Sequence, residues 1–412
     1  MCILSSNIMK KKLIFITTLN YDTILFEKLD FQKYINSKDI ETEFWKHDVY
    51  KKISEKKIKK IYEKSKIQQN KLGSKLKKFS NQWELLKLLK TTNKNCFIYD
   101  FDYFNRSPFF SLLLKLYGAR LIFHGLASFP IIEIQNQDIM QKIKNTPIKK
   151  YFHFFIKTIR FFSRSVINKF FKTKLDIFFY NGNYEKSLSR KISKKAVSLF
   201  TRDYERYLVE SKVKTTKMVK EDYILFLDQG YPVPYDNYFS EENPVTTEEK
   251  YKNGILNFLN SLKKLYKQKK IIVALHPNSE RKNFFGFESY EGCTNQLVKH
   301  ASFVVSHDSL SLQFVALWKK PCLLLFNDDM MDRLTKKKEI EWFKKKMPLE
   351  TLNIDSFNNE ELKKQISSIE LNFLKSKYDN FISEFITNRT INEDEDEKFK
   401  SSLIIDEIKH YQ

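Results

Sequence analysis

Short apolar runs alternate with polar, helix-compatible stretches along the first half of the chain. Four of these runs have the length of strands buried on both faces, and they cover residues 12–17, 96–100, 119–123 and 175–180. Residues 107–117 have helical spacing, and Gly118 ends this predicted helix. Strands that alternate with helices predict a parallel sheet with helices on both of its faces.

The second half repeats this alternation with shorter connections. The predicted strands cover residues 223–227, 270–275, 302–306 and 320–326, and the predicted helices cover 246–268, 294–300 and 309–318. A helical tail is expected from Asn358 onward, and its acidic run over 393–397 is expected to be solvated. This order of elements predicts a doubly wound domain.

A chain of 412 residues fits two domains, because domains commonly have about 150 residues. We therefore expect an α/β protein with two Rossmann-like, doubly wound domains that face a central cleft. The N-terminal domain is expected over 1–215, with a basic, aromatic insertion at about 141–175. The C-terminal domain is expected over 216–385, and an acidic, helical tail over 386–412.

Glycine is scarce, and its spacing excludes several classes of nucleotide-binding protein. The eight glycines form neither G-x-G-x-x-G nor G-x-x-x-x-G-K-[ST], which excludes P-loop NTPases and the usual dinucleotide-binding fingerprint. The four cysteines are isolated, and neither C-x-x-C nor H-E-x-x-H occurs. We therefore expect no metal site and no bound cofactor.

The net charge of +23 is concentrated in two segments. Residues 51–80 hold twelve Lys and two Glu with few aromatic residues, so a solvated helix or a flexible excursion is expected there. Residues 141–200 hold fifteen Lys and Arg, and aromatic residues lie between them. Three interpretations of this second segment stay open: contact with an anionic membrane surface, contact with single-stranded nucleic acid, and a solvated helical face. Because no nucleic-acid-binding motif occurs, nucleic acid is not an expected partner.

No apolar stretch is as long as the roughly 18 residues that a membrane-spanning helix requires. The richest candidate, residues 107–132, is interrupted by Lys115, Arg120 and His124. The apolar run that begins at Leu13 has no signal-peptide cleavage site behind it. We expect a soluble, cytoplasmic protein, with a peripheral position on the inner face of the cytoplasmic membrane as the alternative.

Polar residues follow three predicted strands of the C-terminal half. Asp228 comes directly after the first strand, His276 with Pro277 and Asn278 after the second, and the segment from Ser306 to Ser309 ends the third. Because the carboxyl ends of parallel strands meet at one edge of a sheet, these residues are expected to line one crevice.

The predicted helix after Ser309 adds a second feature to this crevice. Its first N–H groups would be unpaired, and together with the hydroxyls of Ser309 and Ser311 they would form an anion site. This pattern predicts a phosphate-bearing ligand that is held without a P-loop. Each residue also has a structural interpretation, because His276 can end a strand, Ser309 and Asp308 can cap a helix, and Asp228 can form a turn.

The order of these elements resembles the donor half of GT-B glycosyltransferases. The similarity is strongest to the sialyltransferase and Kdo-transferase type of bacterial capsule and lipopolysaccharide biosynthesis, through His276-Pro277 and the serine-rich turn before Lys320-Pro-Cys-Leu-Leu-Leu. The resemblance implies that His276-Pro277 and the serines hold the nucleotide of a CMP- or UDP-type sugar donor. The implied donor-binding set is His276, Pro277, Asn278, Ser306, His307, Asp308, Ser309, Ser311 and Gln313.

Asp228-Gln229-Gly230 partly matches the acidic motif that carries the base in those enzymes, with glutamine in place of the second acid. The resemblance therefore implies that Asp228 and His276 are catalytic. His124, or an acidic residue of the N-terminal half that the sequence does not locate, is the alternative base. On the acceptor side, His124 follows a predicted strand, and Asp102 belongs to an Asp-x-Asp pair with Asp100. The expected acceptor is a glycan or a lipid-linked molecule.

A second resemblance keeps another activity open. The sequence Asp308-Ser309-x-x-x-Gln313 is similar to an element of UDP-N-acetylglucosamine 2-epimerases, which share the GT-B fold. This chain has Leu310 and Ser311 in place of the glycines of that element, and 314–315 holds Phe and Val in place of its glutamates. A nucleotide-sugar epimerase and a non-catalytic nucleotide-binding relative are therefore the alternatives to a glycosyltransferase.

Overall fold

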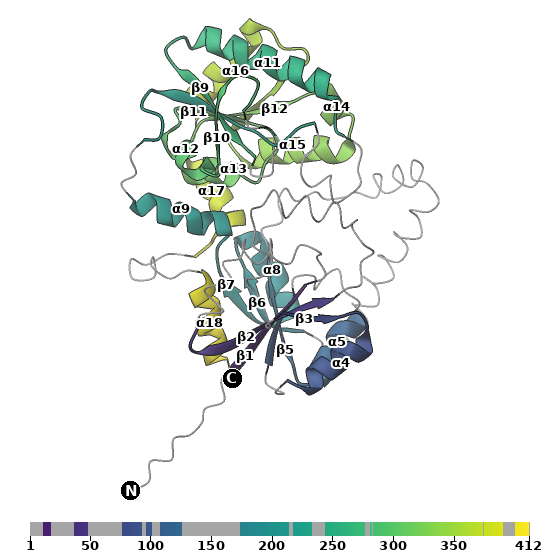
Figure 1. The fold of residues 1–412 in the computed structure, drawn as a ribbon. Coiled ribbons are helices and arrows are strands. Elements are labelled where there is room, and N and C mark those ends of the chain that lie inside the picture. The colour runs from purple at the N-terminus through teal and green to yellow at the C-terminus, as the bar shows by residue number, and fades with distance from the viewer. Residues whose placement is uncertain are drawn as a thin grey trace. The chain divides into compact units, whose positions relative to one another are not determined.

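The structure is a computed structural model, shown as a ribbon in Figure 1. It describes residues 11–17, 37–47, 76–92, 96–100, 108–125, 174–213, 217–232, 244–276, 281, 283–373, 375–389 and 400–411. Several features singled out in the sequence lie outside these residues, namely most of the basic aromatic segment at 141–175, Asp102, Pro277, Asn278 and the acidic run at 393–397.

The described residues form two compact units. Unit 1 contains the described residues up to Leu199 together with 400–411, and unit 2 contains those from Phe200 to Arg389. The division falls before helix α9 (Arg202–Lys212), whereas the sequence places a domain boundary near residue 215. The physical reason is that α9 packs on helices of unit 2, so its contacts assign it there.

Unit 1 is built on a seven-stranded sheet in which every pair of neighbours is parallel. Its strands are β1 (Lys11–Thr17), β2 (Ile40–His47), β3 (Leu76–Phe79), β4 (Cys96–Asp100), β5 (Arg120–His124), β6 (Leu175–Tyr180) and β7 (Ser193–Ser198). The spatial order is β3-β2-β1-β4-β5-β6-β7, so the chain builds outward from β1 in one direction and then from β4 in the other.

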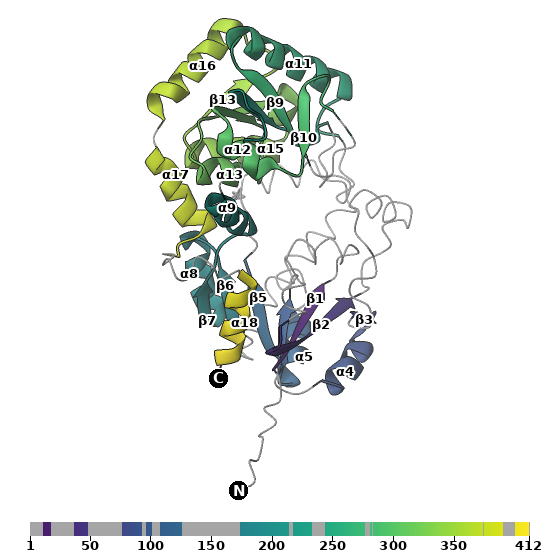
Figure 2. The same cartoon turned by 60° about the vertical axis from the view of Figure 1, so that its left-hand side comes forward.

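Helices cover both faces of this sheet (Figures 1 and 2). Helices α4 (Gln82–Lys90) and α5 (Pro108–Leu116) pack on the face that carries Ile14 and Ile98. Helix α18 (Lys400–His410) packs on the opposite face, and α8 (Asn183–Ile192) contacts β6 and β7. The chain leaves α5 through Gly118, whose φ of 78° favours glycine.

Unit 2 is built on a six-stranded sheet that is also parallel throughout. Its strands are β8 (Tyr223–Leu227), β9 (Lys270–Leu275), β10 (Glu288–Glu291), β11 (Phe303–Ser306), β12 (Cys322–Phe326) and β13 (Leu349–Asn353). The spatial order is β10-β9-β8-β11-β12-β13, in which the winding reverses between β8 and β11.

The helices of unit 2 lie over both faces of its sheet (Figures 1 and 2). Helices α11 (Glu248–Leu265) and α16 (Asn359–Asn372) cover one face, and α12 (Thr294–His300), α13 (Leu312–Leu317) and α15 (Leu334–Lys346) belong to the other. The remaining helical elements are α14 (Asp328–Met331), α17 (Lys375–Phe381) and the π-helical turn Ile382–Ile386.

The predicted fold class is confirmed, because both units are doubly wound parallel α/β sheets. The predicted strands over 96–100, 175–180, 223–227 and 270–275 agree with the structure at both ends. Residues 76–79 lie in a segment expected to be a solvated helix or a flexible excursion, yet they form strand β3. None of the described helices is long and apolar enough to cross a membrane.

Candidate functional site

The candidate site lies at the carboxyl edge of the unit 2 sheet. In open α/β sheets, ligands bind beyond the carboxyl ends of the strands where the winding reverses. In unit 2 this point lies between β8 and β11, which pair from Phe303↔Ile224 to Ser306↔Leu227. The residues that follow these two strands are therefore neighbours, and β9 lies on the other side of β8.

Asp228 is the buried carboxylate at this point. Its side chain is 0% exposed, its backbone N–H donates to the Ala274 carbonyl at 2.9 Å, and its Oδ1 accepts from the Gly230 N–H at 2.9 Å. The other oxygen, Oδ2, has no hydrogen-bond partner in the part of the chain that the structure describes. A buried carboxylate oxygen without a donor is costly, so this atom is the first candidate to accept a hydrogen bond from a ligand.

His307 follows β11 and is fully buried. Its Nδ1 lies 3.0 Å from the Leu325 carbonyl, which can only accept, so Nδ1 carries the proton. Its Nε2 lies 3.1 Å from the Tyr251 hydroxyl and accepts from it. Burial lowers the pKa of His307, so the ring is neutral, and both ring nitrogens are occupied by protein groups. This geometry gives His307 a structural contribution under the site.

Asp308 belongs to a second cluster of polar side chains, which includes Tyr231 and Lys336. Its side chain is 3% exposed and accepts from the Tyr231 hydroxyl at 2.8 Å, and it pairs with Lys336 of α15. Lys336 also contacts Glu339 at 2.7 Å. Burial, followed by a hydrogen bond with Asp308, raises the pKa of Glu339 to about 7. Lys336 therefore lies between two carboxyls, and the pKa of Glu339 is raised while that of Asp308 is lowered.

Arg281 belongs to the site, although the sequence analysis did not identify it. Its Nη2 donates to the Tyr231 carbonyl at 2.7 Å, and its Nη1 lies 4.0 Å from Oδ1 of Asp228. The guanidinium lies over two aromatic rings, 5.6 Å from the centroid of Phe284 and 5.1 Å from that of Phe285. In the sequence, only its position five residues after His276 points to Arg281. This indication is weak, because basic residues are common throughout the chain.

His276 lies directly after β9, and the structure places it half-buried at the same edge as Asp228. Pro277 and Asn278, the other residues predicted from this loop, lie outside the described residues. Strand β9 pairs with β8 up to Leu227↔Ala274, so His276 and Asp228 follow neighbouring strands. The predicted meeting of these two residues at one sheet edge agrees with this topology.

The serine-rich turn has a different geometry from the predicted helix start. Helix α13 has six residues and begins at Leu312, not at Ser309. The N–H groups of residues 312–314 bond to carbonyls three residues earlier at 3.0–3.1 Å, and the Ser311 N–H bonds to Oγ of Ser309 at 3.0 Å. The expectation of unpaired N–H groups at these four residues is therefore wrong, because tight turns satisfy them locally.

The other predicted residues of this segment lie in two places. Ser309 is buried and its Oγ accepts from the Gln229 side chain, which keeps it at the strand edge beside Asp228. Ser306 donates to the His307 carbonyl at 2.7 Å. Gln313, in contrast, faces α9, where it accepts from Thr201 at 2.7 Å and donates to Asp203 at 3.2 Å. The structure therefore separates Gln313 from the strand ends.

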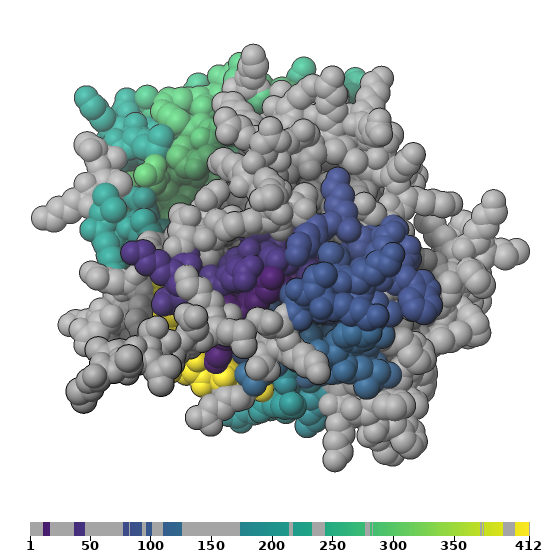
Figure 3. Space-filling model, turned by 60° about the horizontal axis from the view of Figure 1, so that its bottom comes forward, coloured from purple at the N-terminus to yellow at the C-terminus, as the bar shows by residue number. Residues whose placement is uncertain are grey.

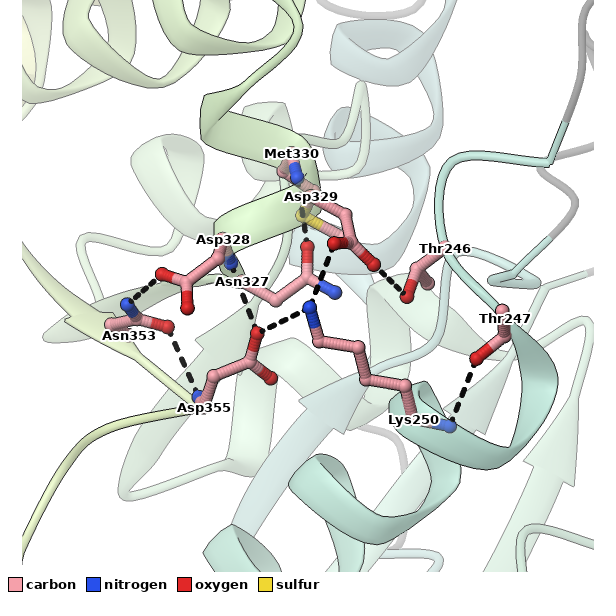
Figure 4. A network of polar contacts seen from close by, with 9 residues as sticks. All are labelled: Thr246, Thr247, Lys250, Asn327, Asp328, Asp329, Met330, Asn353 and Asp355. Carbon is pink, nitrogen blue, oxygen red and sulfur yellow. Dashed lines mark hydrogen bonds and ion pairs between the residues drawn. The ribbon is translucent and has the colours of Figure 1, made fainter.

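The loops after β12 and β13 form a polar rim beside these residues (Figure 4). Lys250 of α11 lies between two carboxylates, 2.7 Å from Asp329 and 3.2 Å from Asp355. Asn327 follows β12, is 0% exposed, and caps α14 by accepting from the Met330 N–H at 2.9 Å. The Nδ2 of Asn327 has no hydrogen-bond partner among the described residues. The rim ties the start of α11 to the carboxyl ends of β12 and β13.

His124 of unit 1 has a separate, buried environment at the end of β5. The Asn181 amide nitrogen donates to the Gly125 carbonyl, so the Asn181 oxygen faces His124 and accepts from its Nε2–H at 3.1 Å. The lone pair on Nδ1 of His124 is buried and has no partner in the described residues. Burial, followed by Lys400, places the pKa of His124 well below its ordinary value, so Nδ1 stays an acceptor.

Glu185 fixes this arrangement from α8. Its carboxylate accepts from the Asn181 backbone N–H at 3.0 Å and packs on Gly125, where a Cβ would collide with it. Burial raises the pKa of Glu185. His124 is thus oriented by groups of its own unit, and Asp102, the other predicted acceptor-side residue, lies outside the described residues.

No group of three or more His, Cys, Asp or Glu side chains in the described segments is arranged to hold a metal ion. No protein-family model matches the chain, and no curated protein matches it.

Several solved structures are similar to the chain at low identity. MurG of Acinetobacter baumannii is 7% identical over 97% of this chain and 99% of its own, with a TM-score of 0.45. UDP-GlcNAc 2-epimerase of Methanocaldococcus jannaschii is 14% identical over 87% and 92%, with a TM-score of 0.43. A glycosyltransferase of kitacinnamycin is 7% identical over 90% and 92%, with a TM-score of 0.41. Similarity at this level carries neither a reaction nor a ligand over to this chain.

Proposed function

We propose that this protein is a glycosyltransferase that uses a nucleotide sugar as donor and binds it at the carboxyl edge of the unit 2 sheet. The observation that carries the proposal is the buried, unpartnered Oδ2 of Asp228 at the point where the winding of the sheet reverses. Around it lie a half-buried imidazole, His276, and a guanidinium, Arg281. One hydrogen-bond acceptor beside cationic or N–H-donating groups suits a ligand with hydroxyls and phosphate.

The transfer reaction needs a base for the acceptor hydroxyl and a group that stabilises the charge of the leaving phosphate. The acceptor oxygen forms a bond to the anomeric carbon and gives its proton to a base, while the bond from that carbon to the phosphate oxygen breaks and the phosphate keeps the electron pair. We assign the charge on the leaving phosphate to His276, with Ser309 as a hydroxyl donor. This assignment keeps two residues of the donor set that the sequence predicts, His276 and Ser309.

The base is assigned to Asp228, and His124 is the alternative. Each has a buried acceptor atom without a partner in the described residues, Oδ2 of Asp228 and Nδ1 of His124. The variants Asp228→Asn and His124→Gln keep the side-chain size and remove or weaken the base. We expect Asp228→Asn to lower kcat by about 100-fold or more, the usual range for loss of a general base, and His124→Gln to leave kcat within about threefold.

The substrates are proposed from the resemblance in sequence. We infer a CMP- or UDP-type donor, a glycan or lipid-linked acceptor, and a place in bacterial surface-polysaccharide biosynthesis. A lipid-linked acceptor would give the basic aromatic segment at 141–175 a role at an anionic membrane surface. That segment lies outside the described residues, so its support comes from composition alone.

The donor site is tested by thermal unfolding of the wild type, His276→Ala and His410→Ala with CMP, UDP, GDP and their sugar conjugates. His410 is an exposed histidine at the end of α18 and serves as the matched control. We expect one nucleotide class to raise the Tm of the wild type and the control, since a ligand at 100 times its Kd stabilises by about 2.7 kcal/mol. His276→Ala should lose this rise.

Two results would contradict the proposal. A rise in Tm that His276→Ala retains in full would remove His276 from the donor site, and no rise with any nucleotide would remove the donor site from unit 2. The stabilising conjugate is then incubated without acceptor. An unchanged sugar agrees with a transferase, whereas conversion to its epimer would show the alternative, a nucleotide-sugar epimerase.

A further inference from the structure

We propose that Arg281 binds the phosphate group of the nucleotide. In the protein without ligand, the buried carboxylate of Asp228, 4.0 Å from the guanidinium, balances part of the positive charge of Arg281. This inference rests on the proposed function, because it names a residue of the same site. Arg281 comes five residues after His276, and its side chain is 18% exposed, so solvent reaches part of it.

A hydrogen bond and two aromatic rings position the guanidinium. Its Nη2 donates to the Tyr231 carbonyl at 2.7 Å, and its plane lies over the rings of Phe284 and Phe285. Tyr231 itself is 1% exposed and tied through its hydroxyl to Asp308. A preorganised guanidinium presents a planar fork that matches phosphate oxygens, and little side-chain entropy remains to be lost on binding.

The contact with Asp228 is too long for a hydrogen bond. Nη1 of Arg281 lies 4.0 Å from Oδ1 of Asp228, whereas a guanidinium–carboxylate hydrogen bond measures about 2.7–2.9 Å. The pair therefore gains Coulomb attraction without a direct bond. Glu248 also lies 4.0 Å from Nη2 of Arg281, but its side chain is 73% exposed, so solvent screens its charge more than that of the buried Asp228. A phosphate can approach the guanidinium and keep this arrangement, because no hydrogen bond between the two residues has to break.

A tight turn over residues 284–287 places an aromatic ring beside Arg281. Phe285 and Gly286 have positive φ values of 51° and 89°, the Phe287 N–H donates to the Phe284 carbonyl at 3.0 Å, and the Phe285 ring lies against the guanidinium. The same ring carries Lys252 at 5.6 Å from its centroid. Phe285 thus supports two cations, and only Arg281 also lies next to the buried carboxylate.

The test compares ligands that differ only in phosphate. Binding of inorganic pyrophosphate, of whichever of CMP, UDP and GDP stabilises the wild type, and of the corresponding nucleoside is measured by calorimetry. We expect Arg281→Gln to weaken both phosphate ligands by about tenfold or more and the nucleoside by less than about twofold, since a charge-assisted hydrogen bond contributes at least this much. Lys252→Gln is the matched control and should retain the wild-type affinities.

Asp228→Asn should change the affinity for pyrophosphate in the opposite direction from Arg281→Gln. Removing the negative charge 4.0 Å from Arg281 should strengthen pyrophosphate binding, by about fivefold or more, even though the same variant loses transfer activity. Arg281→Lys keeps the charge without the fork, so its affinity should fall between wild type and Arg281→Gln. The Tm without ligand reports whether each variant is folded.

The outcomes separate this inference from the proposed function. Nucleotide binding by the wild type with equal affinities in Arg281→Gln would overturn the role of Arg281 alone. Equal losses in Arg281→Gln and Lys252→Gln would also overturn it, because general positive potential would then explain binding. Pyrophosphate binding that needs Arg281 while every nucleotide fails to bind would support the phosphate site and overturn the proposed function.

Discussion

Two carboxyls and one lysine form a charged cluster that is linked to the candidate site through Tyr231. Asp308 and Glu339 meet at Lys336, and burial of Asp308 is outweighed by its ion pair with Lys336, so the pKa of Asp308 stays below its ordinary value. The pKa of Glu339 is instead raised, to about 7. Near neutral pH the cluster therefore changes its charge, and Tyr231 connects it to Arg281.

The shifted pKa of Glu339 predicts a pH dependence of stability. The unfolded carboxyl titrates near 4.5 and the folded one near 7, so between these values the folded state holds a proton that the unfolded state has released. Stability from this group is therefore lost as pH rises from about 4.5 to about 7. Glu339→Gln mimics the protonated carboxyl and should raise the free energy of unfolding by about 1–3 kcal/mol at pH 8, with little change at pH 4.5.

Urea unfolding at both pH values measures this difference. Glu341 is an exposed carboxylate on the same helix, so Glu341→Gln is the control and should change stability little at either pH. A Glu339→Gln variant that is equally or less stable than the wild type at pH 8 would contradict the raised pKa of Glu339.

Residues at strand ends could be predicted, and residues placed by long-range contacts could not. Asp228, His276 and His307 follow predicted strands, so parallel topology brings them to one edge. Arg281 is positioned by the Tyr231 carbonyl fifty residues away in sequence, which no local pattern encodes. The side chain of Gln313 turns toward Thr201, because α9 packs on α13. The spacing of residues in the sequence does not predict which way such a side chain is oriented.

At the scale of elements, the C-terminal helix α18 completes the core of unit 1. Its Ile404 and Ile408 are 0% exposed and pack with strands β1, β2 and β4. Lys11 of β1 caps the end of the helix by donating to the carbonyls of residues 408, 409 and 411 at 2.8–3.1 Å. Figure 3 shows α18, in yellow, at the same face as the purple residues of the first strands.

Truncating this helix at one buried position should therefore destabilise unit 1. Ile404→Ala leaves a cavity beneath β1 and β4, and a loss of about 2–5 kcal/mol is expected for such a position. Hydrogen exchange should speed up at the amides of β1 and β4. His410→Ala, at the exposed end of the same helix, should change neither quantity. Unaltered exchange in β1 and β4 of Ile404→Ala would contradict the placement of α18.

The strands that escaped prediction are those with few consecutive apolar residues. Strand β2 carries Glu43 in its interior, where Lys12, Lys77 and the Trp45 ring nitrogen neutralise and bond it. Strands β7, β10 and β13 lie at sheet edges and expose part of their residues. Apolar runs predict strands buried on both faces, so edge strands and strands with paired charges need tertiary contacts to become visible.

At the scale of the whole molecule, both units repeat one strand order. Each sheet starts at its middle, adds two strands on one side, and then continues on the other, so each has a single point of reversal. In unit 2 the residues that follow this point, including Asp228 and His307, are described in full. In unit 1 the reversal lies between β1 and β4, and the residues that directly follow both strands lie outside the described ones. Among the described residues, only unit 2 therefore shows the residues that follow the strands on both sides of its point of reversal, where a ligand is expected to bind.

The central claim is that a nucleotide sugar binds at the carboxyl edge of the unit 2 sheet. Hydrogen exchange of the full chain, with and without a saturating concentration of the stabilising nucleotide sugar, tests it most directly. We predict slower exchange in peptides that contain residues 228–232, 276–281 and 306–311, and unchanged exchange at β10 and at the amino ends of the strands. Protection confined to unit 1, or no protection at these three loops, would contradict the account.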